Sequence, residues 1–201
     1  MTAFKGKSCA IVGNSGIMKD SNHGELIDSH DFIIRFNSAR VEGWEKDVGS
    51  KTNLRILNIH NFLGQSGSFR FEKDDPMFVP NLPKQDLMII RNPGNHGYKW
   101  NQQIMDARRN GNDLFVLGDN IWNKCKKQLG GVDPSVGFVG LTLALENFEE
   151  ISIFGFDHGN ISDDRRHYWE RVRGWKGNHV LNKEGEIMNE LHANGRIKKH
   201  K

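Results

Sequence analysis

Residues 8–16 read SCAIVGNSG, an apolar run that leads directly into a small polar loop flanked by glycines. Such a run is typical of a buried strand, and such a loop is typical of the turn between a strand and a helix. Backbone N–H groups at the start of the next helix point outward and attract an anion. A second apolar run, residues 32–36, ends at Asn37. Two neighbouring strands that deliver Asn14 and Asn37 to their loops predict a nucleotide pocket.

Further apolar runs of strand length follow, at residues 54–57, 87–90, 114–117 and 151–156. Helical patterns lie between several of them, at residues 99–109, 119–129 and 137–149. Continuous apolar strands that alternate with amphipathic helices are typical of a mostly parallel sheet with helices on both faces. The sequence therefore predicts an α/β fold.

Two further segments complete this organisation. Residues 61–84 contain prolines and mixed polarity and are predicted to form a long loop or lid, a kind of segment that usually has a functional role in a compact domain. A last helix is predicted to start after Asn182, a suitable N-cap, and to end at Gly195.

The composition indicates a globular chain. With 201 residues, 36% hydrophobic and 26% charged, it is predicted to form a single domain over residues 1–201, with a short basic tail at 196–201. We expect no membrane span and no signal peptide in this chain, because no apolar run approaches the ~20 residues that cross a bilayer. Nucleic-acid-binding domains usually have a pI above ~9. The net charge of +3 and pI of about 8.8 therefore do not favour a nucleic-acid partner.

Four ordered segments carry a resemblance to a known family. The first segment, within residues 9–53, contains VGNSG, IDSHDFIIRFN and DVGSKTN. The second is PSVG at 134–137, which continues to IFGF at 153–156. The third is HYWE at 167–170, and the fourth is His179 followed by Glu184. In this order they resemble the L, S, III and VS motifs of the eukaryotic-type sialyltransferases. The resemblance implies a GT-A-like (Rossmann-like) fold and an inverting transfer of sialic acid from CMP-sialic acid to a glycan hydroxyl. It also implies a galactose-terminated acceptor, and a CMP-sugar that is a co-substrate, so that no cofactor is expected.

The catalytic residues are assigned through the same motifs. The acceptor hydroxyl needs a base, a role that histidine commonly fills. By its match to the VS motif, His179 is the predicted base, and by its match to motif III, His167 is predicted to bond the phosphate of the leaving CMP. Tyr168 resembles a motif III residue near the nucleotide. Glu184 is interpreted either as orienting the loop of His179 or as an acid in the first turn of a helix, and the sequence leaves both open.

The donor-binding positions implied by the resemblance are Asn14, Ser15, Asn37, Ser135 and Gly137. The first two match the L-motif loop that contacts the phosphate and sugar of CMP, and Asn37 matches the second L-motif asparagine. The turn at residues 135–137 opens a helix whose N–H groups can hold a carboxylate or phosphate. Val136 stands where the family commonly has Thr or Ser, which leaves the donor open between sialic acid and Kdo.

The pattern of acids, cysteines and histidines predicts no metal site. The chain has no D-x-D triplet and no Cys/His cluster with zinc spacing. We therefore expect metal-independent catalysis, as the resemblance also implies.

The two cysteines are Cys9 and Cys125. In the family the L-motif cysteine usually pairs with an S-motif cysteine, whose position holds Phe148 in this chain. The family disulfide is therefore not expected, which favours a reducing, cytoplasmic compartment over the Golgi lumen. The sequence leaves open whether Cys9 pairs with Cys125.

Three alternative functions compete with sialyl transfer. The first keeps the scaffold and uses CMP-Kdo or a related keto-acid sugar. The second is a catalytically silent CMP- or glycan-binding module, against which the intact His167 and His179 argue. The third, a dinucleotide-binding Rossmann protein, does not fit, because GNSG is not the G-x-G-x-x-G fingerprint.

Overall fold

The computed structural model describes residues 6–58, 105, 113–157, 167–169 and 181–200, and the backbone of the strands at 65–66, 69–70 and 86–90. Its seven-stranded sheet is made of β1 (Ser8–Val12), β2 (Phe32–Phe36), β3 (Leu54–Asn58), β6 (Asp86–Ile90), β7 (Leu114–Leu117), β8 (Glu150–Phe154) and β9 (Lys198–Lys199). The strand order is β7-β6-β3-β2-β1-β8-β9, and every neighbouring pair is parallel. The predicted strands and the predicted α/β class are confirmed.

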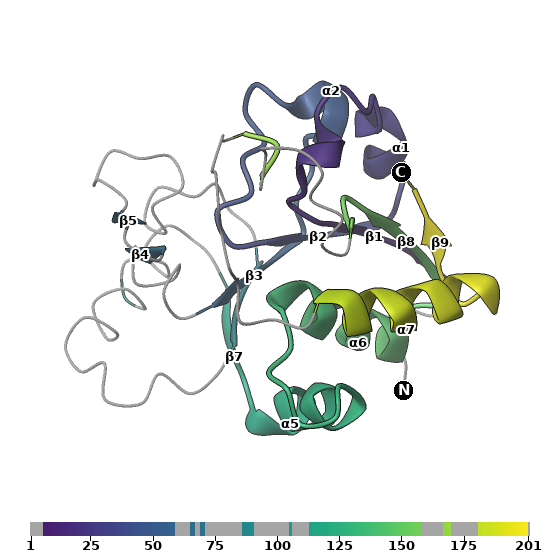
Figure 1. The fold of residues 1–201 in the computed structure, drawn as a ribbon. Helices are drawn as coiled ribbons and strands as arrows, with labels where there is room; N and C mark the ends of the chain where they lie inside the picture. The colour runs from purple at the N-terminus through teal and green to yellow at the C-terminus, as the bar shows by residue number, and fades with distance from the viewer. Residues whose placement is uncertain are drawn as a thin grey trace.

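Short helices cover one face of the sheet and longer helices cover the other (Figure 1). The short ones are η1 (Gly16–Met18), α1 (Gly24–Asp28) and α2 (Glu45–Val48), and the longer ones are α5 (Asp119–Gln128), α6 (Val136–Asn147) and α7 (Leu181–Ala193). A separate antiparallel pair is formed by β4 (Gln65–Ser66) and β5 (Phe69–Arg70). The helices predicted at 119–129 and 137–149 are confirmed within two residues. The helix predicted at 99–109 lies outside the described residues, apart from Met105, as does most of the predicted loop at 61–84.

The last helix differs from the prediction at its start. Helix α7 includes both Leu181 and Asn182, so Asn182 is not its N-cap. Its end agrees better, because Gly195 has a φ of +70°, the left-handed conformation that glycine adopts after a helix. Helix ends fray, so a sequence pattern locates a helix more precisely than it locates its first residue.

The residues of β1 alternate between two apolar cores. Cys9 and Ile11 pack in the cluster beneath α5, α6 and α7, whereas Ala10 and Val12 pack in the cluster beneath η1, α1 and α2. A parallel strand with helices on both sides buries both of its faces, which explains why its sequence is continuously apolar. The prediction of helices on both faces is confirmed.

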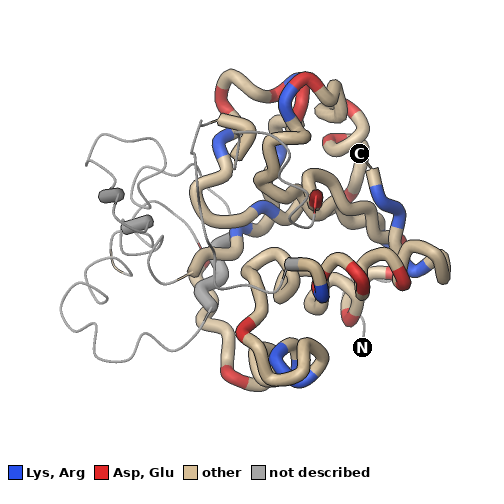
Figure 2. The backbone as a smooth tube through the Cα atoms, viewed as in Figure 1, with Lys and Arg blue, Asp and Glu red and all other residues tan. Residues whose placement is uncertain are grey.

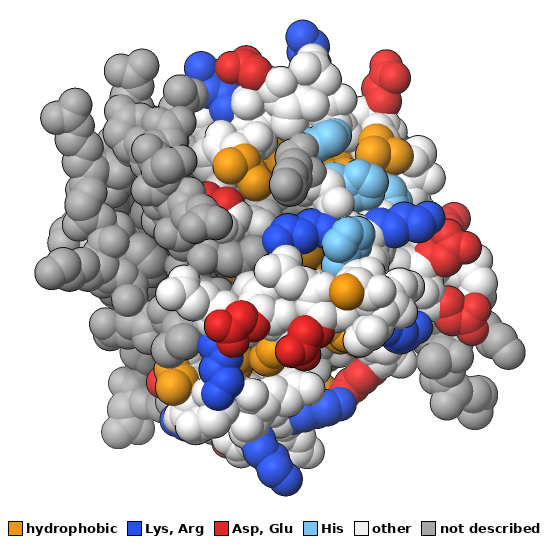
Figure 3. All heavy atoms as spheres, turned by 45° about the vertical axis from the view of Figure 1, so that its right-hand side comes forward, with side chains coloured by type: hydrophobic (Ala, Val, Ile, Leu, Met, Phe, Trp, Pro, Cys, Tyr) orange, Lys and Arg blue, Asp and Glu red, His pale blue; other side chains and the backbone are white. Residues whose placement is uncertain are grey.

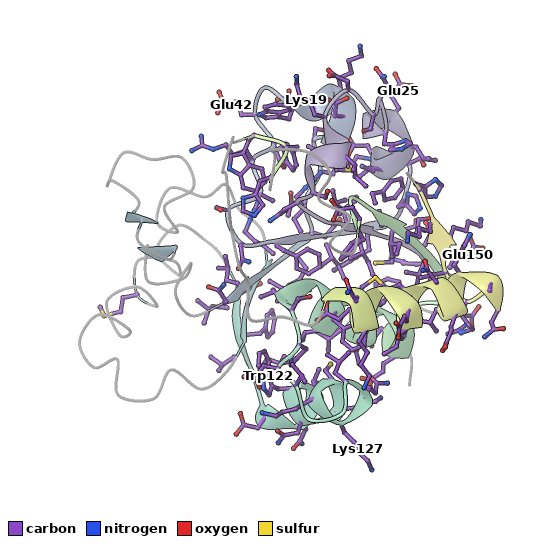
Figure 4. All side chains as sticks on the ribbon, in the orientation of Figure 1. Lys19, Glu25, Glu42, Trp122, Lys127 and Glu150 are labelled. Atoms are coloured by element: carbon purple, nitrogen blue, oxygen red, sulfur yellow. The ribbon has the colours of Figure 1, made fainter. Side chains whose placement is uncertain are left out.

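Helix α5 shows how the outer layer is oriented. In Figure 4 the side chain of Trp122 lies on the inner side of α5, and that of Lys127 points away from the molecule. Trp122 packs against the larger apolar cluster. The helix therefore buries one face and exposes the other, as its amphipathic pattern predicts.

Both cysteines are free and buried. Burial raises the pKa of the Cys9 thiol to about 12, and the Cys125 thiol lies 3.2 Å from the Thr142 hydroxyl. Phe148, at the position of the expected family cysteine, packs in the same cluster as Cys9, and its ring lies 5.4 Å from that of Phe32. An aromatic contact thus occupies the position of the family disulfide.

We expect neither cysteine to react with a thiol reagent in the folded protein. The thiolate is the reactive form, and a buried thiol with a raised pKa supplies little of it near neutral pH. Titration with Ellman's reagent at pH 8 should label no cysteine before denaturation and both cysteines in guanidinium chloride. Rapid labelling of the native protein would contradict the buried placement, and a deficit of thiols after denaturation would reveal a disulfide.

Candidate active site

The predicted donor residues meet at one edge of the sheet. From β1 the chain moves outward through β2 and β3 to β6 and β7, and then returns to β8 on the other side of β1 (Figure 1). In parallel sheets, ligands bind outside the carboxyl ends of the strands where the strand order reverses in this way. Residues 13–15, Asn37 and residues 155–157 follow the carboxyl ends of β1, β2 and β8. The candidate site therefore lies at the point of the fold that favours ligand binding.

The loop after β1 is held tightly against the loop after β8. The Gly13 N–H donates to the Phe154 carbonyl at 2.7 Å, and a Cβ at Gly13 would lie 2.4 Å from the Gly155 carbonyl oxygen. Only glycine fits that approach. The Asn14 amide Nδ2 donates to the Phe36 carbonyl at 3.3 Å, whereas Oδ1 is buried and has no hydrogen-bond partner among the described residues. Asn14 is thus oriented by β2 and retains an unused acceptor.

Ser15 joins this loop to β8 through its side chain. Its hydroxyl donates to Asp157 Oδ2 at 2.6 Å and accepts from the Ile17 N–H at 3.3 Å, which caps η1. Sequence reasoning missed Asp157, although a signal was present, because an acid directly follows the predicted strand at 151–156. The Ser15 hydroxyl is therefore part of a network that Asp157 orients.

Asn37 adopts a left-handed conformation, with a φ of +48°. Its N–H donates to the Ile56 carbonyl at 2.9 Å, and its Oδ1 accepts from the Asn58 N–H at 3.0 Å. Asparagine tolerates this conformation better than most residues. The contacts fix the loop after β2 against β3.

Two buried arginines lie behind the asparagine loops. Arg35 and Arg55 are partners in the register of β2 and β3. Figure 2 shows basic positions within the central sheet as well as on the outer helices. Arg35 donates to the backbone carbonyls of Val48, Gly49 and Lys51. Arg55 Nη1 donates to the carbonyls of Asn37 at 2.8 Å and Ala39 at 3.0 Å. Burial lowers the pKa of Arg35 to about 10 and that of Arg55 to about 9. Both side chains stay protonated near neutral pH, so positive charge lies behind the loop of Asn37.

The S-motif turn is fixed by Glu184. The Glu184 carboxylate accepts from the Ser135 N–H at 2.7 Å and from the Ser135 hydroxyl at 2.6 Å. That hydroxyl also accepts from the Phe138 N–H at 3.1 Å, so Ser135 is the N-cap of α6. A Cβ at Gly137 would lie 2.8 Å from the Phe156 ring, so this position is packed closely against the segment after β8. Glu184 is buried, and its carboxylate joins α7 to the start of α6.

Motif III is described at His167, Tyr168 and Trp169. The His167 ring stacks on the Trp169 ring with centroids 4.6 Å apart and an interplanar angle of 10°. Tyr168 is 2% exposed, and its hydroxyl donates to the Arg40 carbonyl. Burial raises the pKa of Tyr168 to about 12. The Tyr168 side chain therefore packs in the apolar cluster beneath the short helices, beside the loop after β2.

The predicted base, His179, lies outside the described residues. Three other histidines pack around one aromatic ring: His200 stacks on Phe154 at 4.4 Å, and the rings of His23 and His30 approach it edge-on at 5.6 and 5.9 Å. Burial and the neighbouring histidines lower the pKa of His200. Histidines and basic side chains gather on one face of the molecule (Figure 3). These three histidines therefore form an aromatic cluster with Phe154.

Within the part of the chain that the structure describes, no three His, Cys, Asp or Glu side chains are arranged to hold a metal ion. No helix within it has the length and apolar character needed to cross a bilayer.

The chain is similar to known sialyltransferases in sequence. A rat CMP-N-acetylneuraminate-beta-1,4-galactoside alpha-2,3-sialyltransferase is 28% identical over 92% of this chain and 55% of its own length. The human beta-galactoside alpha-2,6-sialyltransferase 2 is 30% identical over 82% of this chain and 34% of its own length. The chain thus spans about half, or less, of the length of these curated relatives.

The fold is also similar to that of solved sialyltransferases. A mammalian sialyltransferase crystallised with Gal-beta-1-3GalNAc-ortho-nitrophenol superimposes with a TM-score of 0.68 and 24% identity, covering 97% of this chain and 69% of that one. The sialyltransferase CstII from Campylobacter jejuni, with CMP, gives a TM-score of 0.56 at 14% identity, covering 98% of this chain and 79% of that one. The family model of glycosyltransferase family 29 matches residues 2–196. This chain therefore belongs to glycosyltransferase family 29, the sialyltransferase family.

Proposed function

We propose that this chain transfers sialic acid from CMP-sialic acid to a hydroxyl of a glycan acceptor, with inversion at the anomeric carbon. The observation that carries the proposal is the convergence of Asn14, Ser15, Asn37 and the Ser135 turn at one edge of the sheet. Family membership supplies the chemistry that these polar groups serve.

The donor is a CMP-sugar with a phosphate and a carboxylate, so its site needs hydrogen-bond donors and positive charge. We assign the phosphate and sugar of CMP to Asn14, Ser15 and Asn37. The Ser135 N–H already donates to Glu184. We therefore assign the carboxylate or phosphate of the donor to the N–H groups of residues 136 and 137, which open α6, since helix N-termini bind anions. The buried charges of Arg35 and Arg55 favour a dianion at this edge, because charges interact more strongly where water is excluded.

In the proposed reaction the acceptor hydroxyl oxygen attacks the anomeric carbon of the donor sugar. The bond from that carbon to the phosphate oxygen breaks, and CMP leaves with the electron pair. We assign removal of the hydroxyl proton to His179, and a hydrogen bond that stabilises the charge on the leaving phosphate to His167. The CMP-sugar is consumed as a co-substrate, and no resident metal or cofactor takes part in these steps.

The acceptor is proposed to be a galactose-terminated glycan. The rat and human relatives are both named for galactosides, although they differ in the linkage that they form. The galactose is therefore the common element.

We also propose that the protein works in a reducing compartment. Cys9 and Cys125 are free and buried, and Phe148 packs where the family resemblance places the second cysteine. A fold that needs no disulfide suits a compartment in which thiols stay reduced.

The proposal is tested by donor turnover. We expect CMP to bind in calorimetry, and CMP-Neu5Ac to be consumed in the presence of a β-galactoside, with EDTA in the buffer. CMP-Kdo serves as the matched donor and should be turned over more slowly. Turnover of CMP-Kdo alone would mean that the donor sugar is Kdo and not sialic acid. CMP binding without any turnover would indicate a silent binding module. A lack of CMP binding would reject the proposed function.

A further inference from the structure

We infer that Tyr168 is a positioning residue, which ties the segment of His167 to both asparagine loops of the donor site without touching the donor. The inference rests on the proposed function for the identity of that donor. It assigns Tyr168 a role different from the nucleotide contact that sequence reasoning predicts.

The first tie runs through the backbone. The Tyr168 N–H donates to the Asn14 carbonyl at 3.2 Å. Asn14 in turn donates from Nδ2 to the Phe36 carbonyl at 3.3 Å. The residue next to His167 is therefore bonded to the loop after β1, and that loop is bonded to the end of β2.

The second tie runs through the side chain. The Tyr168 hydroxyl donates to the carbonyl of Arg40, three residues beyond Asn37. The ring is held in place by Trp44 at 5.4 Å and Trp169 at 4.6 Å, both in edge-on contact. A single side chain thus reaches from motif III to the loop after β2.

Arg55 also anchors the loop after β2. Its Nη1 donates to the carbonyls of Asn37 and Ala39, so the loop over residues 37–40 is held by Arg55 and by Tyr168 at successive carbonyls. Asn37 has a positive φ, which this anchoring helps to maintain. Two buried side chains from separate elements therefore hold the backbone of the loop that carries Asn37.

The burial and the bonding of the Tyr168 side chain argue against a direct contact with the donor. The side chain is 2% exposed and its hydroxyl proton is already used by the Arg40 carbonyl. Removing the hydroxyl should affect the donor only through the positions of the two loops. The expected change is a weaker hold on CMP, with a smaller effect on the acceptor.

The test is Tyr168→Phe, which removes the hydroxyl and keeps the ring. We expect the Kd for CMP and the KM for the CMP-sugar to rise roughly tenfold, the range that one buried hydrogen bond contributes. The KM for the acceptor should change less than twofold, about the scatter expected for a residue with no contact to it. Ser21→Ala is the matched control, because it also removes a hydroxyl that bonds a distant backbone carbonyl, that of Asp47 at 3.3 Å.

The outcomes separate the inference from the proposed function. If wild-type protein binds CMP and Tyr168→Phe binds it equally well, Tyr168 does not position the loops. If Ser21→Ala weakens CMP binding as much, the effect is general destabilisation and the inference is also wrong. If wild-type protein does not bind CMP, the proposed function itself fails.

A second variant covers the case in which Tyr168→Phe does not fold. Trp44→Phe trims the partner ring and leaves the Tyr168 hydroxyl in place. We expect it to raise the Kd for CMP about two- to fivefold, the scale of one aromatic contact. An unchanged Kd in folded Trp44→Phe would overturn the inference.

Discussion

Replacing His179 by alanine is expected to lower sialyl transfer by about 10²–10⁴-fold, the usual contribution of a general base. The acceptor hydroxyl is a weak nucleophile until its proton is removed, and alanine cannot accept that proton. CMP should bind with nearly unchanged affinity, because His179 is not among the groups proposed to hold it. Calorimetry with CMP and a transfer assay with CMP-Neu5Ac measure the two effects separately.

The described residues on both sides of His179 support this expectation. On the N-terminal side, Tyr168 is bonded to the Asn14 carbonyl. On the C-terminal side, Glu184 is bonded to Ser135 at the start of α6. Both flanking segments are therefore fastened to the edge of the sheet where the donor is proposed to bind.

His192→Ala is the matched control for His179→Ala. His192 lies on the last turn of α7, where its Nδ1 is 3.1 Å from the Ile197 carbonyl. It should retain transfer close to the wild-type rate. Equal losses in the two variants would point to a general effect of removing histidine, and full activity of His179→Ala would assign the base to another residue.

The central sheet could be predicted because its strands are apolar on both faces. Ala10 and Ile11 are adjacent in the chain and pack in opposite cores, so the run has no polar position. Strand β9 could not be predicted in the same way. It consists of Lys198 and Lys199 at the edge of the sheet, where half of the strand faces water and charged residues are tolerated.

The candidate site could be predicted in position but only partly in role. Asn14 and Asn37 follow apolar runs, and their meeting at one edge follows from parallel pairing. The contact of Tyr168 with Arg40 joins segments more than a hundred residues apart in sequence. The contact of Arg55 with Asn37 joins segments about twenty residues apart. No local sequence pattern reveals such a contact. A single arginine within an apolar strand, as in β2 and β3, does indicate that the buried guanidinium has hydrogen-bond partners.

Glu184 shows the same limit and leads to a second strong prediction. The sequence left its role open between orienting a loop and placing an acid in the first turn of α7. The structure shows that the carboxylate is buried and that both of its oxygens accept hydrogen bonds from Ser135. A buried carboxylate used in this way costs more to remove than an exposed one, because its partners lose their acceptor without gaining water.

Replacing Glu184 by alanine is therefore expected to destabilise the fold by about 2–4 kcal/mol, since the Ser135 N–H is left unpaired and a cavity forms between α6 and α7. The variant should also bind CMP more weakly, because Ser135 caps the helix whose N-terminus is proposed to face the donor. Glu184→Gln should lose less, because the amide oxygen can still accept from the Ser135 N–H. Urea unfolding measures the free energy of unfolding, and calorimetry measures the affinity for CMP.

Glu186→Ala on the same helix provides the control, because Glu186 is exposed and should change stability by no more than about 0.5 kcal/mol. Three results are informative together. A large loss of stability in Glu184→Ala with unchanged CMP affinity would mean that the carboxylate supports the fold but not the donor turn. If folded Glu184→Ala loses more affinity for CMP than Glu184→Gln does, the carboxylate positions Ser135 for donor binding. Equal stability of the Glu184→Ala and Glu186→Ala variants would contradict the buried hydrogen bonds between Glu184 and Ser135. Losing a buried carboxylate that bonds the start of α6 must cost more stability than losing an exposed one.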